Sequence, residues 1–142
     1  MQIALIIDDV DKYVDIYESY GIGPWIKRDF IPGLIPDMTI NGERGDFHIK
    51  GAFCQYCGVE FELIQPISDS LFKEWLKKNG PGIHHLAFSP KEGYEKFMEN
   101  YKDNGKKTLV EVLNGEKNRG FSYLDTFVDL GFYTEIHKGH SG

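Results

Sequence analysis

Hydrophobic and polar positions follow the same order twice along this chain. Residues 2–7 form a nearly continuous apolar run that two aspartates follow, which predicts a buried strand. A helix should come next, with Asp9 as its N-cap and Gly21 just beyond its end. Residues 85–88 and the stretch after them repeat this strand and helix in the second half. The apolar and aromatic residues at helical spacing are Val10, Tyr13, Val14 and Tyr17 in the first copy, and Tyr94, Phe97, Met98 and Tyr101 in the second.

Three further strands are predicted after each helix. Their residues are 25–31, 47–56 and 59–64 in the first copy, and 108–113, 120–125 and 132–137 in the second. Each copy is therefore expected to form a βαβββ module. The fold class is α+β, with two tandem modules in a single domain over residues 1–142.

The segments between the strands complete this outline. Module one should cover about 1–66 and module two about 82–138, joined by a connector helix within 68–80. Residues 32–45 contain prolines, glycines and an Asn-Gly pair, so we expect the longest loop there, as a mobile flap over a pocket.

Length and composition narrow the function classes. The chain has 142 residues, 41% hydrophobic and 27% charged, as expected for one globular domain with its own core. Its net charge of −6 disfavours a nucleic-acid partner, which needs a clustered basic face. No apolar run approaches the roughly 20 residues of a membrane span, and the chain enters a strand without a signal peptide. We expect a cytoplasmic protein without a membrane partner.

The two cysteines form a CxxC pair at the end of a predicted strand. A zinc site would need a second ligand pair at suitable spacing, and the sequence has none. A redox pair would be expected at a helix N-terminus, which stabilises a thiolate. Cys54 and Cys57 are therefore interpreted as ordinary thiols at a hairpin.

Four coordinating side chains stand at matching places in the two copies. Gln2 and His85 open the first strand of each copy, and Glu62 and Glu135 lie within the closing strands. Taken singly, each glutamate could face solvent. A carboxylate buried without a partner costs several kcal/mol, which a divalent cation would offset. The coincidence of all four predicts one shared metal site made by internal duplication.

Three motifs resemble the vicinal oxygen chelate superfamily, which includes glyoxalase I, methylmalonyl-CoA epimerase, extradiol dioxygenases and antibiotic-resistance binding proteins. They are FELIQP at 61–66, FKEWLKKNG at 72–80 and GIHHLAF at 82–88, and their spacing is most similar to the epimerases. The resemblance implies a cup-shaped mixed sheet and a divalent metal held by Glu62, His85 and Glu135. Epimerases usually carry histidine where Gln2 stands, whereas some glyoxalase I enzymes use glutamine. A single aligned histidine disfavours an extradiol dioxygenase, and the ligands suit Zn, Ni, Co or Mn alike.

The resemblance also implies a reaction. A cation beside two carboxylates can stabilise the enolate that forms when a proton leaves next to a carbonyl. We expect a metal-dependent isomerase or lyase similar to methylmalonyl-CoA epimerase, acting on an acyl-CoA thioester or 2-oxo compound, with Glu135 as base and ligand and Glu62 as the other candidate. The alternatives are a glyoxalase I-like lactoylglutathione lyase and a metal-free small-molecule binding module. The superfamily also suggests a homodimer.

Other polar and aromatic residues are weaker candidates. His84 faces away from His85 on its strand and should pack or bond to the backbone, whereas His137 shares the face of Glu135 and could support it. His48 and Lys50 could contact a ligand, but exposed strand residues are the simpler interpretation. His140 is placed in the terminal tail. Aromatic residues that could line the cup are Phe30, Tyr56, Phe121 and Tyr123.

Overall fold

The computed structural model describes residues 1–35, 37–114, 117 and 119–139. It divides into two compact units. The first unit comprises residues 2–34 and 47–84; the second comprises Met1 together with residues 35–46 and 85–142. The segment 35–46 therefore belongs to a different unit from the residues on either side of it along the chain.

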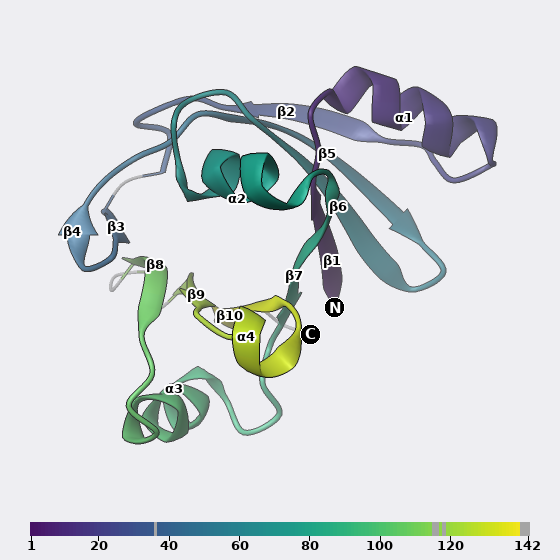
Figure 1. Ribbon diagram of the computed structural model, residues 1–142. Helices are drawn as coiled ribbons and strands as arrows, with labels where there is room; N and C mark the ends of the chain where they lie inside the picture. Colours follow the sequence, from purple (N-terminus) through teal and green to yellow (C-terminus); the bar gives the residue numbers. More distant parts are fainter. Residues whose placement is uncertain (36, 115–116, 118, 140–142) are drawn as a thin grey trace. The chain divides into compact units, whose positions relative to one another are not determined.

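The first unit is a βαβββ module followed by one more helix (Figure 1). Its strands lie in the order β2-β5-β6-β1, and β1 runs parallel to β6 while the other neighbours are antiparallel. The elements are β1 (Gln2–Ile6), α1 (Val10–Ser19), β2 (Ile26–Phe30), β5 (Ile49–Tyr56), β6 (Val59–Pro66) and α2 (Leu71–Asn79).

The second unit repeats the module, with a short hairpin added at one edge. Its strands lie in the order β7-β10-β9-β8-β3-β4, with β7 parallel to β10 and the other pairs that have a defined register antiparallel. The elements are β3 (Met38–Ile40), β4 (Glu43–Arg44), β7 (Gly82–Phe88, of which residues 85–88 belong to this unit), α3 (Tyr94–Asp103), β8 (Thr108–Asn114), β9 (Arg119–Leu124), α4 (Phe127–Leu130) and β10 (Tyr133–Lys138).

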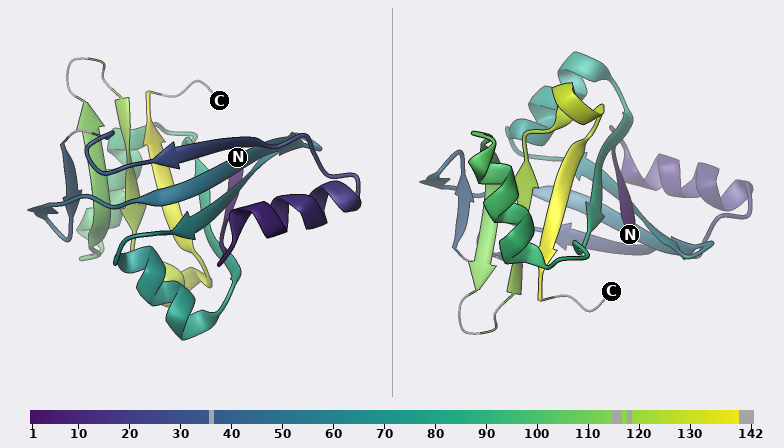
Figure 2. Two further views of the ribbon diagram at one scale, coloured as in Figure 1. Left: turned by 90° about the horizontal axis from the view of Figure 1, so that it is seen from above. Right: turned by 90° about the horizontal axis from the view of Figure 1, so that it is seen from below.

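Each unit has a core between its main helix and one face of its strands. Apolar residues of α1 spaced at i and i+4, Val10 and Val14, pack against Ala52 and Leu63 of the sheet. In the second unit Met98 of α3 packs against Leu124 and Ile136, as Figure 2 shows for the helix lying across its strands. In both units the helix covers one face of the strands, so the residues of opposite parity lie on the other face.

Helix α1 begins and ends as the sequence predicts. The Asp9 side chain accepts a hydrogen bond from the Lys12 amide at 3.2 Å, which confirms the predicted N-cap of α1. Gly21 follows the helix with a positive φ of 85°. Among the described residues, no helix is long and apolar enough to cross a membrane.

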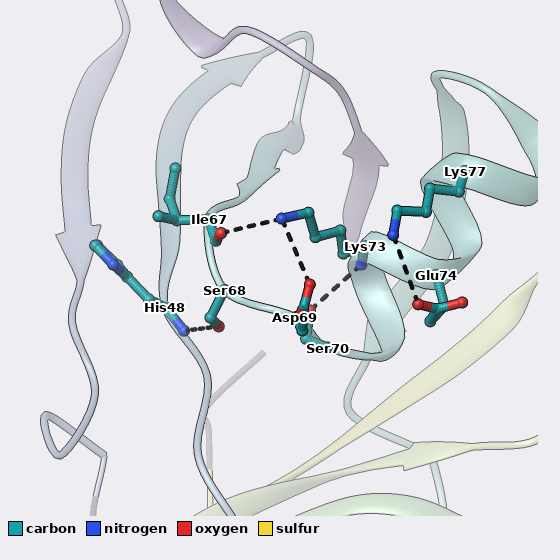
Figure 3. A network of polar contacts seen from close by, with 8 residues as sticks. All are labelled: His48, Ile67, Ser68, Asp69, Ser70, Lys73, Glu74 and Lys77. Atoms are coloured by element: carbon teal, nitrogen blue, oxygen red, sulfur yellow. Dashed lines mark hydrogen bonds and ion pairs between the residues drawn. The ribbon is translucent and has the colours of Figure 1, made fainter.

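The connector helix α2 is held at its start by side chains of its own and neighbouring segments. Ser70 caps it by accepting from the Lys73 amide at 3.3 Å, and the Ser68 hydroxyl accepts from the His48 amide at 2.8 Å (Figure 3). Lys73 also pairs with Asp69 at 3.6 Å. These contacts tie α2 to the residue just before β5 in the same unit.

The fold class is confirmed as α+β with a βαβββ module in each unit, but the loop expected over residues 32–45 is wrong in part. Residues 38–40 and 43–44 form the β3–β4 hairpin, and β3 pairs with β8. The turn uses Asn41 and Gly42, whose φ angles of 54° and 82° match a two-residue turn with positive φ at both positions. The Asn-Gly pair therefore indicates a hairpin turn and not a long loop. Met38, on strand β3, is buried.

The CxxC segment forms a similar hairpin between β5 and β6. Cys57 and Gly58 occupy its two-residue turn with φ angles of 53° and 77°. Both cysteines are free thiols, Cys54 buried and Cys57 exposed. This agrees with their interpretation as ordinary hairpin residues.

Candidate functional site

Strand register in the second unit brings polar side chains onto the face opposite α3. Glu135 of β10 lies opposite Tyr123 of β9 and Ala87 of β7, and Tyr133 lies opposite His85. Since parity alternates along a strand, residues two positions apart share this face. We call these side chains the second-unit cluster: His85, Tyr123, Glu135 and His137.

Direct contacts join the members of the second-unit cluster. His137 Nε2 lies 2.5 Å from Glu135 Oε2, and the Tyr123 hydroxyl lies 3.4 Å from His85 Nε2. A hydrogen bond from the Tyr123 hydroxyl also contributes to lowering the pKa of the Glu135 carboxyl. His85, Tyr123 and Glu135 are all buried. The cluster is thus a packed polar group in a mostly apolar sheet.

Burial sets the charge of these groups. Desolvation lowers the pKa of His85 to about 4, although the Glu135 charge acts in the opposite direction. His85 is therefore neutral at pH 7, the form that can ligate a metal. Burial alone would raise the pKa of Glu135, but the hydrogen bond from His137, together with its other polar neighbours, outweighs burial, so this pKa is lowered. Glu135 is ionised at neutral pH.

The first unit places a different polar group on the face opposite α1. Gln2 lies opposite Glu60, and Glu60 lies opposite Gln55, so three neighbouring strands contribute to one row. Gln2 Nε2 donates to Glu60 Oε1 at 2.6 Å and reaches Glu62 Oε2 at 3.3 Å. Gln55 Nε2 donates to Glu60 Oε2 at 3.0 Å. We call Gln2, Gln55, Glu60 and Glu62 the first-unit row.

The first-unit row fixes the orientation of the Gln2 amide. Because its nitrogen donates to two carboxylates, the amide oxygen is the atom that remains for a cation. Gln2 and Glu62 are only partly buried, unlike the second-unit cluster. The row is therefore more hydrated and its charges are better screened.

The donor atoms suit a divalent cation in type. Each unit offers a carboxylate, with an amide in the first unit and a neutral imidazole in the second, and all three are accepted ligands. Within the residues that the structure describes, no group of three or more His, Cys, Asp or Glu side chains is placed to hold a metal ion. The ligand set Gln2, Glu62, His85 and Glu135 therefore stays a prediction.

The structure also locates the weaker candidates. His84 packs edge-on against Phe72 and Trp75 at 5.5 and 5.1 Å between ring centroids, which confirms its packing role. His48 Nε2 lies 2.7 Å from the Asp29 carboxylate. His140 lies outside the described residues.

The sequence analysis did not predict that Glu60 belongs to the first-unit row or that Tyr123 belongs to the second-unit cluster. Glu60 precedes Glu62 by two positions and shares its face, so strand parity could have identified it. Tyr123 was included only among residues that could line the cup. Its contact with His85 depends on the pairing of β9 with β10, which the sequence does not specify.

Two cavities lie away from the predicted ligands. One of about 390 Å³ in the second unit is lined by residues of α3 and α4, including Tyr101 and Asp129, and by Lys106 of the segment after α3. Another of about 330 Å³ in the first unit is lined by Lys27, Arg28 and Lys50 together with aspartates. Lys27 pairs with Asp11 at 2.7 Å and Lys106 with Asp129 at 3.1 Å. One lysine at each cavity is therefore paired with a carboxylate.

Comparison with known families accounts for the paired modules. The family model described as the Glyoxalase/Bleomycin resistance protein/Dioxygenase superfamily matches residues 1–123. The chain belongs to this superfamily. A search of curated proteins gives no match. Membership establishes the α+β fold of the superfamily, and the reaction has to be argued from the side chains.

Solved structures share the fold of this superfamily member at low identity. A hypothetical protein from Bacillus halodurans C-125 is 19% identical, with a TM-score of 0.66 over 99% of this chain and 94% of that one. Methylmalonyl-CoA epimerase from Mycobacterium tuberculosis is 17% identical, with a TM-score of 0.62 over 96% and 84%. A variant of Streptomyces coelicolor methylmalonyl-CoA epimerase in complex with 2-nitronate-propionyl-CoA is 23% identical, with a TM-score of 0.61 over 96% and 93%.

Proposed function

We propose that this protein is an isomerase or lyase that removes a proton next to a carbonyl, acting on an acyl-CoA thioester in the manner of an epimerase. The observation that carries the proposal is the buried, ionised Glu135 with two hydrogen-bonding neighbours beside a neutral His85. A buried carboxylate without a chemical task costs stability, so its retention favours a catalytic role.

Glu135 would act as the general base. It is ionised at neutral pH and can accept the proton on the carbon next to the carbonyl. Return of the proton to the opposite face gives epimerisation, and return to a neighbouring carbon gives isomerisation. His137, 2.5 Å from Oε2, would stabilise the carboxylate and orient it toward the substrate. Glu62 remains the other candidate base.

A lowered pKa makes Glu135 a weak base, so the enolate must be stabilised for the reaction to proceed. When bound, a divalent cation would supply that stabilisation by polarising the carbonyl oxygen. His85 and Glu135 would hold it, with Gln2 and Glu62 as further predicted ligands. The neutral state of His85 supports this assignment, because a protonated imidazole cannot coordinate a metal.

Similarity of fold to structures of methylmalonyl-CoA epimerase supports a thioester substrate, and one of those structures holds 2-nitronate-propionyl-CoA. Gln2 favours the second candidate, a glyoxalase I-like lyase, because the resemblance places glutamine at this position in some glyoxalase I enzymes. A metal-free binding module is the third candidate. It is favoured by the lack of a group of three metal-binding side chains among the described residues.

The experiment combines metal analysis with proton exchange. The purified protein is analysed for metals before and after chelation and reloading with Zn, Ni, Co or Mn, beside Glu135→Gln and Gln2→Ala. Each form is then incubated in D₂O with methylmalonyl-CoA, and loss of the α-proton signal is followed by NMR. A parallel assay uses the hemithioacetal of methylglyoxal and glutathione.

The outcomes separate the three candidates. Metal near one equivalent, reduced in both variants, with exchange of the thioester proton, supports the epimerase. Turnover of the hemithioacetal alone supports the lyase. No metal uptake and no exchange on either substrate would leave the binding module, and the proposed reaction would be rejected.

A further inference from the structure

Tyr123 is placed to contact both polar groups proposed for the chemistry. It lies on β9 directly opposite Glu135 on β10, so the two side chains leave the sheet on the same face. Its ring meets the His85 imidazole edge-on, with centroids 4.8 Å apart at 80°, and its hydroxyl lies 3.4 Å from His85 Nε2.

The ring and the hydroxyl of Tyr123 have separate tasks. The ring is buried and packs against His85 and also against Phe121, at 5.5 Å between centroids. A phenylalanine would preserve these contacts. A hydroxyl in such a site needs partners of its own, since an unpaired buried hydroxyl is unfavourable.

The direction of the hydrogen bonds follows from the donors and acceptors that meet here. The tyrosine hydroxyl has one proton to donate, carboxylate oxygens accept, and an imidazole nitrogen can donate as well as accept. The proton is therefore assigned to the bond with Glu135, and the hydroxyl oxygen then accepts from His85 Nε2–H. His137 holds the Glu135 carboxylate through Oε2. Glu135 is thus held by two side chains, and Tyr123 links it to His85.

We propose that Tyr123 is a positioning residue, whose hydroxyl holds the Glu135 carboxylate in place and fixes the orientation and tautomer of the His85 ring. The inference rests on the proposed function for its effect on catalysis. Its effect on His85 is a property of the metal-free protein and stands apart from the reaction.

The test is Tyr123→Phe in the full chain, with Tyr94→Phe as matched control. The Tyr94 variant also loses one side-chain hydrogen bond, the 2.8 Å bond between Tyr94 and Ser122. This bond lies on the opposite face of the strands, the face that packs against α3. Histidine ¹⁵N–¹H correlation spectra of the metal-free proteins report the tautomer of each imidazole, and His85→Gln identifies the His85 signals. In the wild type His85 should carry its proton on Nε2.

The expected result has two parts. Tyr123→Phe reduces the population of the Nε2–H tautomer of His85 and lowers kcat roughly tenfold, with KM within about twofold, as expected for losing one hydrogen bond to a charged group. Tyr94→Phe changes neither. A merely structural role would leave the His85 tautomer unchanged in Tyr123→Phe.

Failure of this inference is distinguishable from failure of the proposed function. Unchanged His85 signals in Tyr123→Phe overturn it, and so does an unchanged kcat in an active enzyme. Absence of turnover in the wild type rejects the proposed reaction instead, and the spectra alone then decide whether Tyr123 positions His85.

Discussion

The first-unit row and the second-unit cluster occupy corresponding faces of two similar modules, yet they differ in chemistry. The row consists of amides and carboxylates that are partly exposed. The cluster is buried and includes two imidazoles and a phenol around one carboxylate. The same backbone pattern thus supports a partly exposed group of amides and carboxylates in one unit and a buried group with imidazoles in the other. Under the proposed function, the second unit would supply the base and the first unit further ligands.

Replacing the glutamates of the two units should show this division most clearly. Glu135→Gln is expected to lower kcat for proton exchange by about 10³-fold, the range for loss of a general base, whereas Glu62→Gln should cost roughly tenfold or less. The measurement is the rate of α-proton exchange in D₂O. Urea unfolding of both variants controls for folding. A larger loss in Glu62→Gln would reverse the assignment of the base.

The acid response of His85 provides a second contrast, since the matching residue Gln2 does not titrate. The folded pKa of about 4 lies below the ordinary 6.5, so between these values the unfolded chain binds a proton that the folded protein does not. The free energy of unfolding should therefore fall as pH drops from 6.5 to 4, by about 3 kcal/mol for 2.5 pKa units at 1.36 kcal/mol each.

Urea unfolding of the chelated protein across this pH range checks the prediction. His85→Gln is the control and should show a correspondingly flatter dependence. Glu135 contributes in a more acidic window: its lowered folded pKa adds stability above the ordinary value of 4.5 that is lost as pH falls further. Equal slopes for the wild type and His85→Gln between pH 6.5 and 4 would contradict the buried, neutral imidazole.

The smallest effect is expected in the first-unit row. Gln2→Ala and Glu60→Ala form a double-mutant cycle for the 2.6 Å hydrogen bond between them. Because the row is partly exposed, the coupling in the free energy of unfolding should be about 1 kcal/mol or less. Urea unfolding of the four proteins measures it. A coupling of several kcal/mol would show that the row is as strongly coupled as a buried network.

Periodicity was sufficient to predict most of the fold. The helical spacing around Val14 and Met98 identified the two main helices, because each buries one face on its sheet. It did not predict α4, whose four residues leave Val128 94% exposed and so carry no amphipathic pattern. It also missed β3, a three-residue strand whose pairing with β8 depends on distant residues.

The candidate site was only partly predictable. Strand parity places Glu135 and His137 on one face, and the structure adds that they contact each other. Parity says nothing of rotamers or of which strands pair, so the link through Tyr123 was not foreseen. The predicted ligand set rests on the duplicated pattern and on the resemblance, and metal analysis tests it.

The hairpin β3–β4 limits where the chain can be divided into fragments. Residues 35–46 are encoded within the first half but complete the edge of the second unit beside β8. A fragment cut at the connector helix, residues 82–142, would leave β8 as an open edge prone to pairing with other chains. The two halves of the sequence are therefore not interchangeable building blocks, and fragment complementation of this chain has to supply the hairpin together with the later half.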